Sequence, residues 1–161
     1  MLFRSVPKGL WERIKSAEKA ERGETAADTA LSGVPLALPA LTRALKLQNK
    51  AGRVGFDWND PRAVLAKIRE EADEIEAALD ADDRAHAADE VGDLLFAVVN
   101  LARHLAADPE GVLRKTNLKF EQRFAFIERA LAARGKTPRE TTLAEMDALW
   151  DAAKAQEKAG G

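Results

Sequence analysis

The sequence predicts an all-α protein, a helical bundle of about five or six helices, and three observations support this. Residues that favour helices dominate, above all Ala, Leu, Glu, Lys and Arg, whereas β-branched residues are scarce. Apolar residues recur every three or four positions in several segments, as they do on one face of a helix. No segment alternates apolar and polar residues in the manner of a half-buried strand.

Composition excludes several classes of protein. The 161 residues suffice for one domain with a buried core, and the formal net charge of −2 argues against binding to duplex nucleic acid. Without cysteine there are no disulfides, thiolate metal sites or cysteine nucleophiles. No apolar run is long enough to span a membrane or to form a signal peptide, so we expect a cytoplasmic protein.

The first half of the chain is divided by glycine and proline. Residues 8–22 are amphipathic and predict a short helix, and a Gly- and Pro-containing connector follows. A helix is predicted over about 39–50, with Pro39 in its first turn and its end near Gly52.

Two further helices form a predicted hairpin. Asp60 and Pro61 are a cap and first-turn proline that begin one helix, and the turn Asp80-Ala81-Asp82-Asp83 leads into the next. Because the turn is short, the two helices are expected to be antiparallel neighbours. The predicted core positions are those of two apolar stripes, Val64, Ile68, Ala72, Ile75 and Leu79 on the first helix and Val91, Leu94, Leu95, Val98, Ala102 and Leu105 on the second.

The last two helices have clear beginnings. Asp108 and Pro109 repeat the cap-then-proline pattern, and that helix is expected to end near Gly135. The spacing of Thr142 and Glu145 is that of a capping box, which predicts a final helix extending to about Gln156.

Acidic residues cluster on the predicted hairpin, as Glu70-Glu71-x-x-Glu74 on one helix and Glu90-x-x-Asp93 on the other. Residues three or four apart share a helix face, so these acids are expected to converge at the border of the core. An all-oxygen donor set favours Mg²⁺, or Mn²⁺ in its place. A solvated acidic face is the alternative for such runs, but Gly92, between the second pair, weakens a helix and leaves room beside the acids.

Histidines give a poor alternative metal site. A ferritin-like di-iron bundle needs Glu-x-x-His on two helices, whereas Asp83 and Leu101 stand three residues before His86 and His104. His86 lies one turn before Glu90, where it is either a substrate contact or a solvated turn residue.

Basic residues follow at helical spacing, with Lys115, Lys119 and Arg123 four positions apart. The stripe is either a solvated salt-bridge face or, opposite a metal-binding acidic cluster, a surface that holds polyphosphate. Trp150 either docks the final helix or stacks on a base, and docking is the simpler interpretation.

These motifs resemble the MazG branch of the all-α nucleoside triphosphate pyrophosphohydrolases. The segments that carry the resemblance are E-E-x-x-E, then fifteen residues, then E-x-x-D, together with LPALTRALKLQNKAGRVGFDW, DEVGDLLFAVVNLARHL, KTNLKFEQRF and ARGKTP…LAEMDALW. Residues 34–161 are similar to the C-terminal catalytic domain of such proteins. Residues 1–33 resemble the segment that precedes this domain in two-domain members, whose first domain has no counterpart here.

The resemblance implies a set of site residues. Metal ligands for Mg²⁺ would be Glu71, Glu74, Glu90 and Asp93. Substrate contacts would come from Lys67, His86, Lys119, Arg123 and Trp150, whereas Gln122 replaces a frequent arginine. It also implies a homodimer or higher homo-oligomer whose helices share one bundle.

The reaction implied is hydrolysis of a nucleoside triphosphate, ribose or deoxyribose, at the α-phosphorus to a nucleoside monophosphate and pyrophosphate. Water would attack without a covalent intermediate, and Glu70 or a ligand acid such as Glu71 would accept its proton. A narrower enzyme of the same fold, such as a deoxyuridine triphosphate hydrolase, and a catalytically inert helical interaction module are the alternatives.

Overall fold

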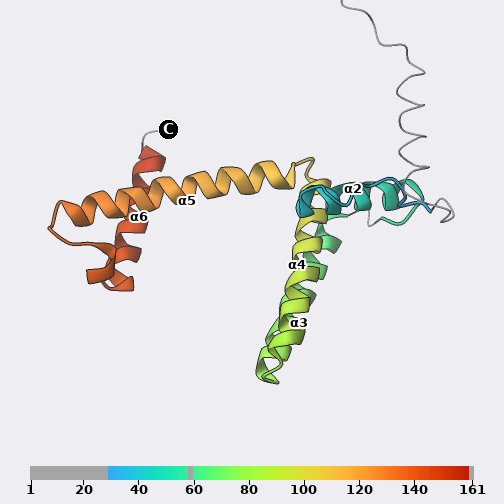
Figure 1. The fold of residues 1–161 in the computed structure, drawn as a ribbon, viewed down its shortest axis with the longest axis horizontal. Coiled ribbons are helices and arrows are strands. Elements are labelled where there is room, and N and C mark those ends of the chain that lie inside the picture. The colour runs from blue at the N-terminus through green and yellow to red at the C-terminus, as the bar shows by residue number, and fades with distance from the viewer. Residues whose placement is uncertain (1–28, 58–59, 160–161) are drawn as a thin grey trace, which may run out of the picture.

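The computed structural model describes residues 29–57 and 60–159, and this part of the chain contains helices and no strand. The all-α prediction is therefore confirmed, whereas the helix predicted over residues 8–22 lies outside the described residues. The elements in order are α2 (Ala40–Arg53), α3 (Pro61–Asp80), α4 (Arg84–His104), α5 (Pro109–Ala132), the short 3₁₀ helix η1 (Pro138–Glu140) and α6 (Leu143–Ala159) (Figure 1).

The predicted helix starts are confirmed by their caps. The side chains of Asp60, Asp83 and Asp108 each accept a hydrogen bond from a backbone N–H in the first turn of α3, α4 and α5. At α6, the Thr142 hydroxyl accepts from the Glu145 N–H and the Glu145 carboxylate accepts from the Thr142 N–H, both at 3.3 Å. This reciprocal pair is the predicted capping box.

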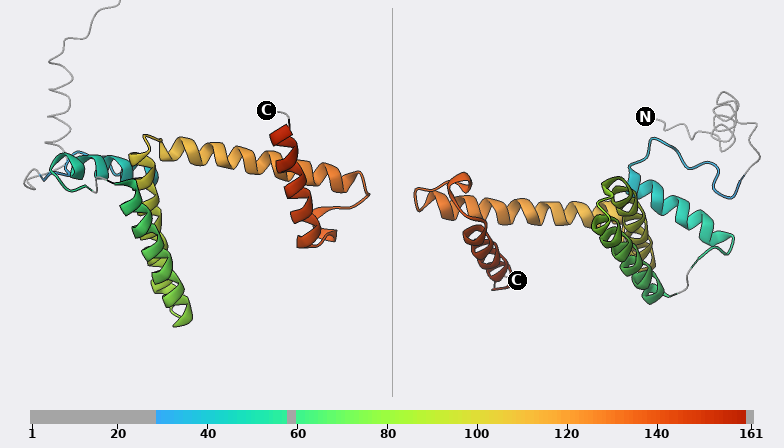
Figure 2. Two further views of the ribbon diagram at one scale, coloured as in Figure 1. Left: turned by 180° about the vertical axis from the view of Figure 1, so that it is seen from behind. Right: turned by 90° about the horizontal axis from the view of Figure 1, so that it is seen from below.

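The helices form two packing units rather than one closed bundle. In the first unit α3 and α4 form an antiparallel hairpin and α2 packs against α4 (Figure 1). Helix α5 then runs away from the end of α4, and α6 folds back across its far half (Figure 2). The acids of the hairpin and the basic stripe of α5 are thereby placed on different arms of one chain.

Small residues form much of the contact between α3 and α4. The predicted apolar stripes, which were expected to be buried, are mostly not buried within one chain. Val64, Glu71 and Ala78 are the buried residues of α3, and on α4 the buried ones are Ala87, Ala97, Val99 and Asn100. Of the predicted stripes, Val64 is buried, Ile68, Ile75, Leu94 and Ala102 are partly buried, and the rest are exposed, namely Ala72, Leu79, Val91, Leu95, Val98 and Leu105. Alanine allows the two backbones to approach, and Glu71 is buried in this contact while most of the longer apolar side chains stay exposed.

The second unit has a conventional apolar core. Ile127 and Leu131 on α5 and Leu149 on α6 are buried together, with partly buried Phe124, Met146, Trp150 and Ala130 packed around them. Leu131 is 1% exposed. Burial of these side chains holds α6 against the far end of α5.

Apolar residues are exposed along α4 and the adjacent half of α5. The α4–α5 apolar face consists of Val91, Leu95, Val98, Leu105, Val112, Leu113, Leu118 and Phe120. Large exposed apolar areas on proteins often serve as interaction sites. None of the described helices combines the length and the apolar character that crossing a membrane requires.

Candidate functional site

Three carboxylates from two helices converge in the hairpin. Glu71 of α3 and Glu90 and Asp93 of α4 each place an oxygen within 4.8 Å of the others. Glu71 is only 4% exposed, which is unusual for an acid and sets this cluster apart from a solvated face. The structure therefore brings three of the predicted acids together at the edge of the α3–α4 contact, with Glu71 buried, Glu90 partly buried and Asp93 exposed.

Glu74, the fourth predicted ligand, lies one turn further along α3. Loss of hydration raises the pKa of its carboxyl, and the negative charges of Glu71 and Glu90 add to this effect. Glu74 is thus close enough to interact with the cluster, but it is not one of the three acids that the geometry brings within 4.8 Å.

Lys67 supplies a positive charge beside the acids. Its Nζ lies 2.6 Å from Oε1 of Glu71 and 3.0 Å from Oε1 of Glu70. The hydrogen bond to Glu71 raises the pKa of the Lys67 ammonium well above its usual value, and it lowers the pKa of the Glu71 carboxyl. The cluster is therefore partly neutralised by a side chain of the same helix, and Glu71 stays ionised although it is buried.

His86 and Gly92 flank the cluster on α4. Nδ1 of His86 lies 3.4 Å from Oε1 of Glu90, and the His86 side chain is largely exposed. A Cβ atom built on Gly92 would have no neighbour within 4 Å. Gly92 is therefore not required for packing within one chain, and the surface beside the acids is open to an approaching ligand or partner.

A cavity of about 410 Å³ adjoins the acids. Its polar lining includes Lys67, Glu71 and Asp93, so it shares residues with the cluster. Two buried amides, Gln48 of α2 and Asn100 of α4, also line it, and neither was singled out from the sequence. A polar residue inside the apolar run of α4 was the available signal for Asn100.

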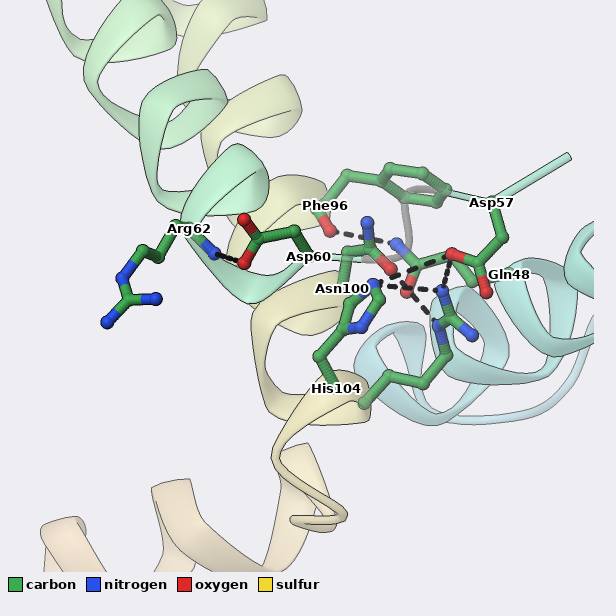
Figure 3. Close-up of polar contacts among 8 residues, drawn as sticks. Gln48, Asp57, Asp60, Arg62, Phe96, Asn100 and His104 are labelled. Atoms are coloured by element: carbon green, nitrogen blue, oxygen red, sulfur yellow. Dashed lines mark hydrogen bonds and ion pairs between the residues drawn. The ribbon is translucent and has the colours of Figure 1, made fainter.

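A polar network holds the loop before α3 against α4 (Figure 3). Arg103 pairs with the carboxylate of Asp57, and Nε of Arg103 donates to Oδ1 of Asn100 at 3.1 Å. His104 is mostly buried, with Nε2 3.5 Å from Oδ1 of Asp57. On the other side, Nε2 of Gln48 donates to the Phe96 carbonyl at 2.8 Å. These contacts set the orientation of both cavity amides.

The basic residues form a second group in the middle of α5. Arg123 donates from Nε and a terminal nitrogen to both carboxylate oxygens of Glu157, at 3.0 and 2.7 Å. Its guanidinium lies 5.2 Å from the centre of the Trp150 ring, which also packs against Phe120. Trp150 therefore docks α6, as expected, and in this position it also flanks Arg123.

The structure thus brings the predicted site residues together in two groups. Lys67, Glu70, Glu71, Glu74, His86, Glu90 and Asp93 lie on the hairpin, and Lys119, Arg123 and Trp150 lie on the α5–α6 arm (Figures 1 and 2). Because the arm extends away from the hairpin, a single chain does not place the basic group over the acids.

The fold and the acid cluster define an all-α protein with a candidate divalent-cation site between two antiparallel helices. Residues 59–125 match the MazG nucleotide pyrophosphohydrolase domain, so this stretch is similar to that family. The resemblance identified from the motifs is confirmed.

Similar proteins extend the match over most of the chain. The nucleoside triphosphate pyrophosphohydrolase of Escherichia coli K12 is 46% identical over 149 residues, which cover 91% of this chain and 56% of that protein. A Thermotoga maritima protein named nucleoside triphosphate pyrophosphohydrolase/pyrophosphatase MazG is 38% identical over 89% of this chain and 54% of its own length. The uncharacterized protein YabN of Bacillus subtilis is 42% identical over 92% of this chain and 30% of its own. The chain therefore spans about half the length, or less, of these curated relatives.

Proposed function

We propose that this protein is a Mg²⁺-dependent nucleoside triphosphate pyrophosphohydrolase that converts NTPs or dNTPs to the nucleoside monophosphate and pyrophosphate. The observation that carries the proposal is the convergence of Glu71, Glu90 and Asp93 from two helices, within residues that match the MazG domain. The names of the relatives from E. coli and T. maritima support the same activity.

The residues fit a hard divalent cation. Three carboxylate oxygens within 4.8 Å of one another are a donor set suited to Mg²⁺, with Mn²⁺ as a substitute, and Glu74 lies close enough to join them. When bound, the cation would supply positive charge that offsets the charge of the triphosphate. The hydrogen bond from Lys67 lowers the pKa of the Glu71 carboxyl despite its burial, so a negative ligand is in place before any cation arrives.

The remaining hairpin residues are assigned roles by position. Lys67 would exchange part of its contact with Glu71 for a phosphate oxygen, and His86 would contact the nucleotide beside Glu90. Glu70 is exposed next to Lys67, so it or a ligand acid such as Glu71 would accept the proton of the water that attacks the α-phosphorus. The P–O bond to the β-phosphate then breaks, and pyrophosphate leaves without a covalent enzyme intermediate.

A homodimer or higher homo-oligomer would complete both the fold and the site. The α4–α5 apolar face is exposed in one chain, and a second copy would cover it. The same assembly would allow Lys119 and Arg123 of one copy to reach the phosphates held at the acids of another, and Trp150 to contact the nucleotide. The cytoplasmic location, the domain boundary near residue 33 and the lack of duplex-nucleic-acid binding stay predictions from the sequence.

Product identification tests the reaction class. Purified protein with Mg²⁺ and a panel of common and deoxyuridine nucleotides should release monophosphate and pyrophosphate in equal amounts. Release of a nucleoside diphosphate and phosphate would overturn the proposal. Turnover of dUTP alone would favour the narrower enzyme, and neither turnover nor a Mg²⁺-dependent rise in melting temperature would favour the inert module.

A further inference from the structure

The cavity between α2, α3 and α4 contains two amides that the reaction does not use. It shares Lys67, Glu71 and Asp93 with the candidate metal site, and its other walls include Leu47, Phe56 and Phe96. We propose that this cavity receives the nucleobase of the nucleotide, and that Gln48 and Asn100 hydrogen-bond to the edge of the base. The inference rests on the proposed function, because it names the part of the substrate that lies next to the triphosphate.

The size and the walls of the cavity suit a planar heteroaromatic ring. A volume of about 410 Å³ lies within the range of small-molecule sites and exceeds that of a single base. Apolar and aromatic side chains supply most of its surface, which favours stacking over solvation of a base. Since acids that would hold the metal and the triphosphate line the same cavity, a base in it is joined directly to the reacting phosphates.

Gln48 presents a hydrogen-bond acceptor. The residue is 7% exposed, and its Nε2 already donates to the Phe96 carbonyl at 2.8 Å. Its Oε1 is buried and has no hydrogen-bond partner among the described residues. A buried carbonyl oxygen without a donor is costly, so this atom is expected to be matched by an N–H group of a ligand.

Asn100 presents the complementary donor. It is 6% exposed, and its Oδ1 accepts from Nε of Arg103, which is itself paired with Asp57 (Figure 3). The contact with Arg103 therefore fixes the Asn100 amide and leaves its Nδ2 to donate a hydrogen bond to a ligand. One fixed acceptor and one fixed donor match the adjacent N–H and C=O, or N–H and ring nitrogen, that every common base presents on one edge.

The test compares substrates with and without a base. For the wild type and for Gln48→Met, kcat/KM is measured with ATP, UTP and ribose 5-triphosphate, which has the same reacting phosphates and no base. Methionine conserves the volume of Gln48 but has no amide. The matched control is Gln156→Met, the same substitution at an exposed position of α6.

We expect Gln48→Met to lower kcat/KM for both nucleotides by about ten-fold, the effect of losing one buried hydrogen bond. Its kcat/KM for ribose 5-triphosphate and all values for Gln156→Met should match those of the wild type. An equal loss with and without the base, or no loss with the nucleotides, would overturn the inference. Asn100→Asp, which keeps an acceptor for Arg103 and removes the donor, gives an independent arm with the same expected pattern.

A second measurement distinguishes failure of the proposed function from failure of the base-site inference. If the wild type hydrolyses none of the three compounds, adenosine and uridine are titrated into ¹⁵N-labelled protein, and the side-chain amide signals of Gln48 and Asn100 are followed. Shifts in the wild type that are absent in Gln48→Met would support a base site without the reaction. Unchanged amide signals in the wild type would overturn it.

Discussion

The α3–α4 hairpin and the α5–α6 arm are both pairs of packed helices, yet their interiors differ in chemistry. The hairpin buries Glu71 and Asn100 among alanines and valines. The arm buries Ile127, Leu131 and Leu149 and keeps its ion pair, Arg123 with Glu157, at the edge. A carboxylate inside a helix interface costs desolvation energy that leucine does not.

This difference separates function from stability within one chain. Burying a carboxylate and amides in the hairpin lowers the stability of the fold. Functional sites commonly carry such a cost, because the residues that form them are not those that would pack best. The arm has the composition of a structural core, and its contribution to the proposed site is limited to Lys119 and Arg123 of α5 and Trp150 of α6. The predictions below test whether the two regions behave in these two ways.

The largest expected effect is on catalysis at the hairpin. Glu71→Gln removes a negative ligand from the centre of the acid cluster and should lower kcat/KM for NTP hydrolysis by roughly 10³-fold. Helical circular dichroism should not change, since glutamine has nearly the same helix propensity. Mg²⁺ should raise the melting temperature of the wild type but not that of the variant.

Asp73→Asn is the matched control for Glu71→Gln. Asp73 is an exposed acid of the same helix and is not one of the three converging acids. Its loss should leave turnover within about two-fold of the wild type. Equal losses in the two variants would show that the helix needs negative charge in general rather than this cluster.

The next effect is on the stability of the arm. Leu131→Ala removes a side chain that is 1% exposed and should lower the free energy of unfolding by about 3 kcal/mol. In hydrogen exchange, amide protection should fall in α5 and α6 more than in α3 and α4, because the arm has its own core. The control Leu143→Ala, at a position that is 79% exposed, should change stability by about 0.5 kcal/mol or less. A uniform loss of protection in all helices would instead show one cooperative unit.

A charge introduced on the α4–α5 apolar face tests whether the hairpin of one copy and the arm of another form a shared site in a dimer. Leu95 is 52% exposed in one chain, and Leu95→Arg should weaken the proposed dimer by about 100-fold. Sedimentation equilibrium measures the dissociation constant, and turnover should fall as the dimer dissociates because acids and basic residues would come from different copies. Leu36→Arg, which introduces the same charge at an exposed loop position, is the control. A wild type that stays monomeric yet turns over at low concentration would contradict the shared site.

The elements of this fold were readily predicted because their signals are local. Asp60, Asp83 and Asp108 cap their helices by contacts within the first turn, and the Thr142–Glu145 box closes within three residues. Which residues of α3 and α4 are buried within one chain was predicted correctly for Val64 but wrongly for most of the two stripes. Hydrophobicity favoured the Leu95 face, whereas close approach through Ala78 and Ala87 placed Glu71 inside.

The candidate site was predictable in part for the same reason. Helical spacing alone placed Glu90 and Asp93 on one face, and the short turn brought that face toward Glu71. The cavity amides were not predicted because Gln48 and Asn100 are 52 positions apart in sequence and meet only through packing of α2 on α4. The separation of Arg123 from the acids likewise depends on the direction of α5, which no local pattern specifies.

The smallest expected effect concerns the ion pair of the arm, and it tests whether that pair competes with substrate. Arg123 lowers the pKa of the Glu157 carboxyl, so the pair stabilises the fold at pH values above the ordinary glutamate pKa. This contribution is lost as the pH falls through the lowered pKa. Glu157→Gln should therefore melt slightly below the wild type at pH 7, and the difference should vanish in strong acid.

At pH 7 the same variant should have a lower KM for nucleotide, because Arg123 no longer has to leave a carboxylate to bind phosphate. Glu128→Gln, an exposed acid on the same arm, should change neither quantity. A higher KM in Glu157→Gln would instead mean that Glu157 holds Arg123 in the orientation that phosphate needs, and the pair would then belong to the site rather than to the scaffold.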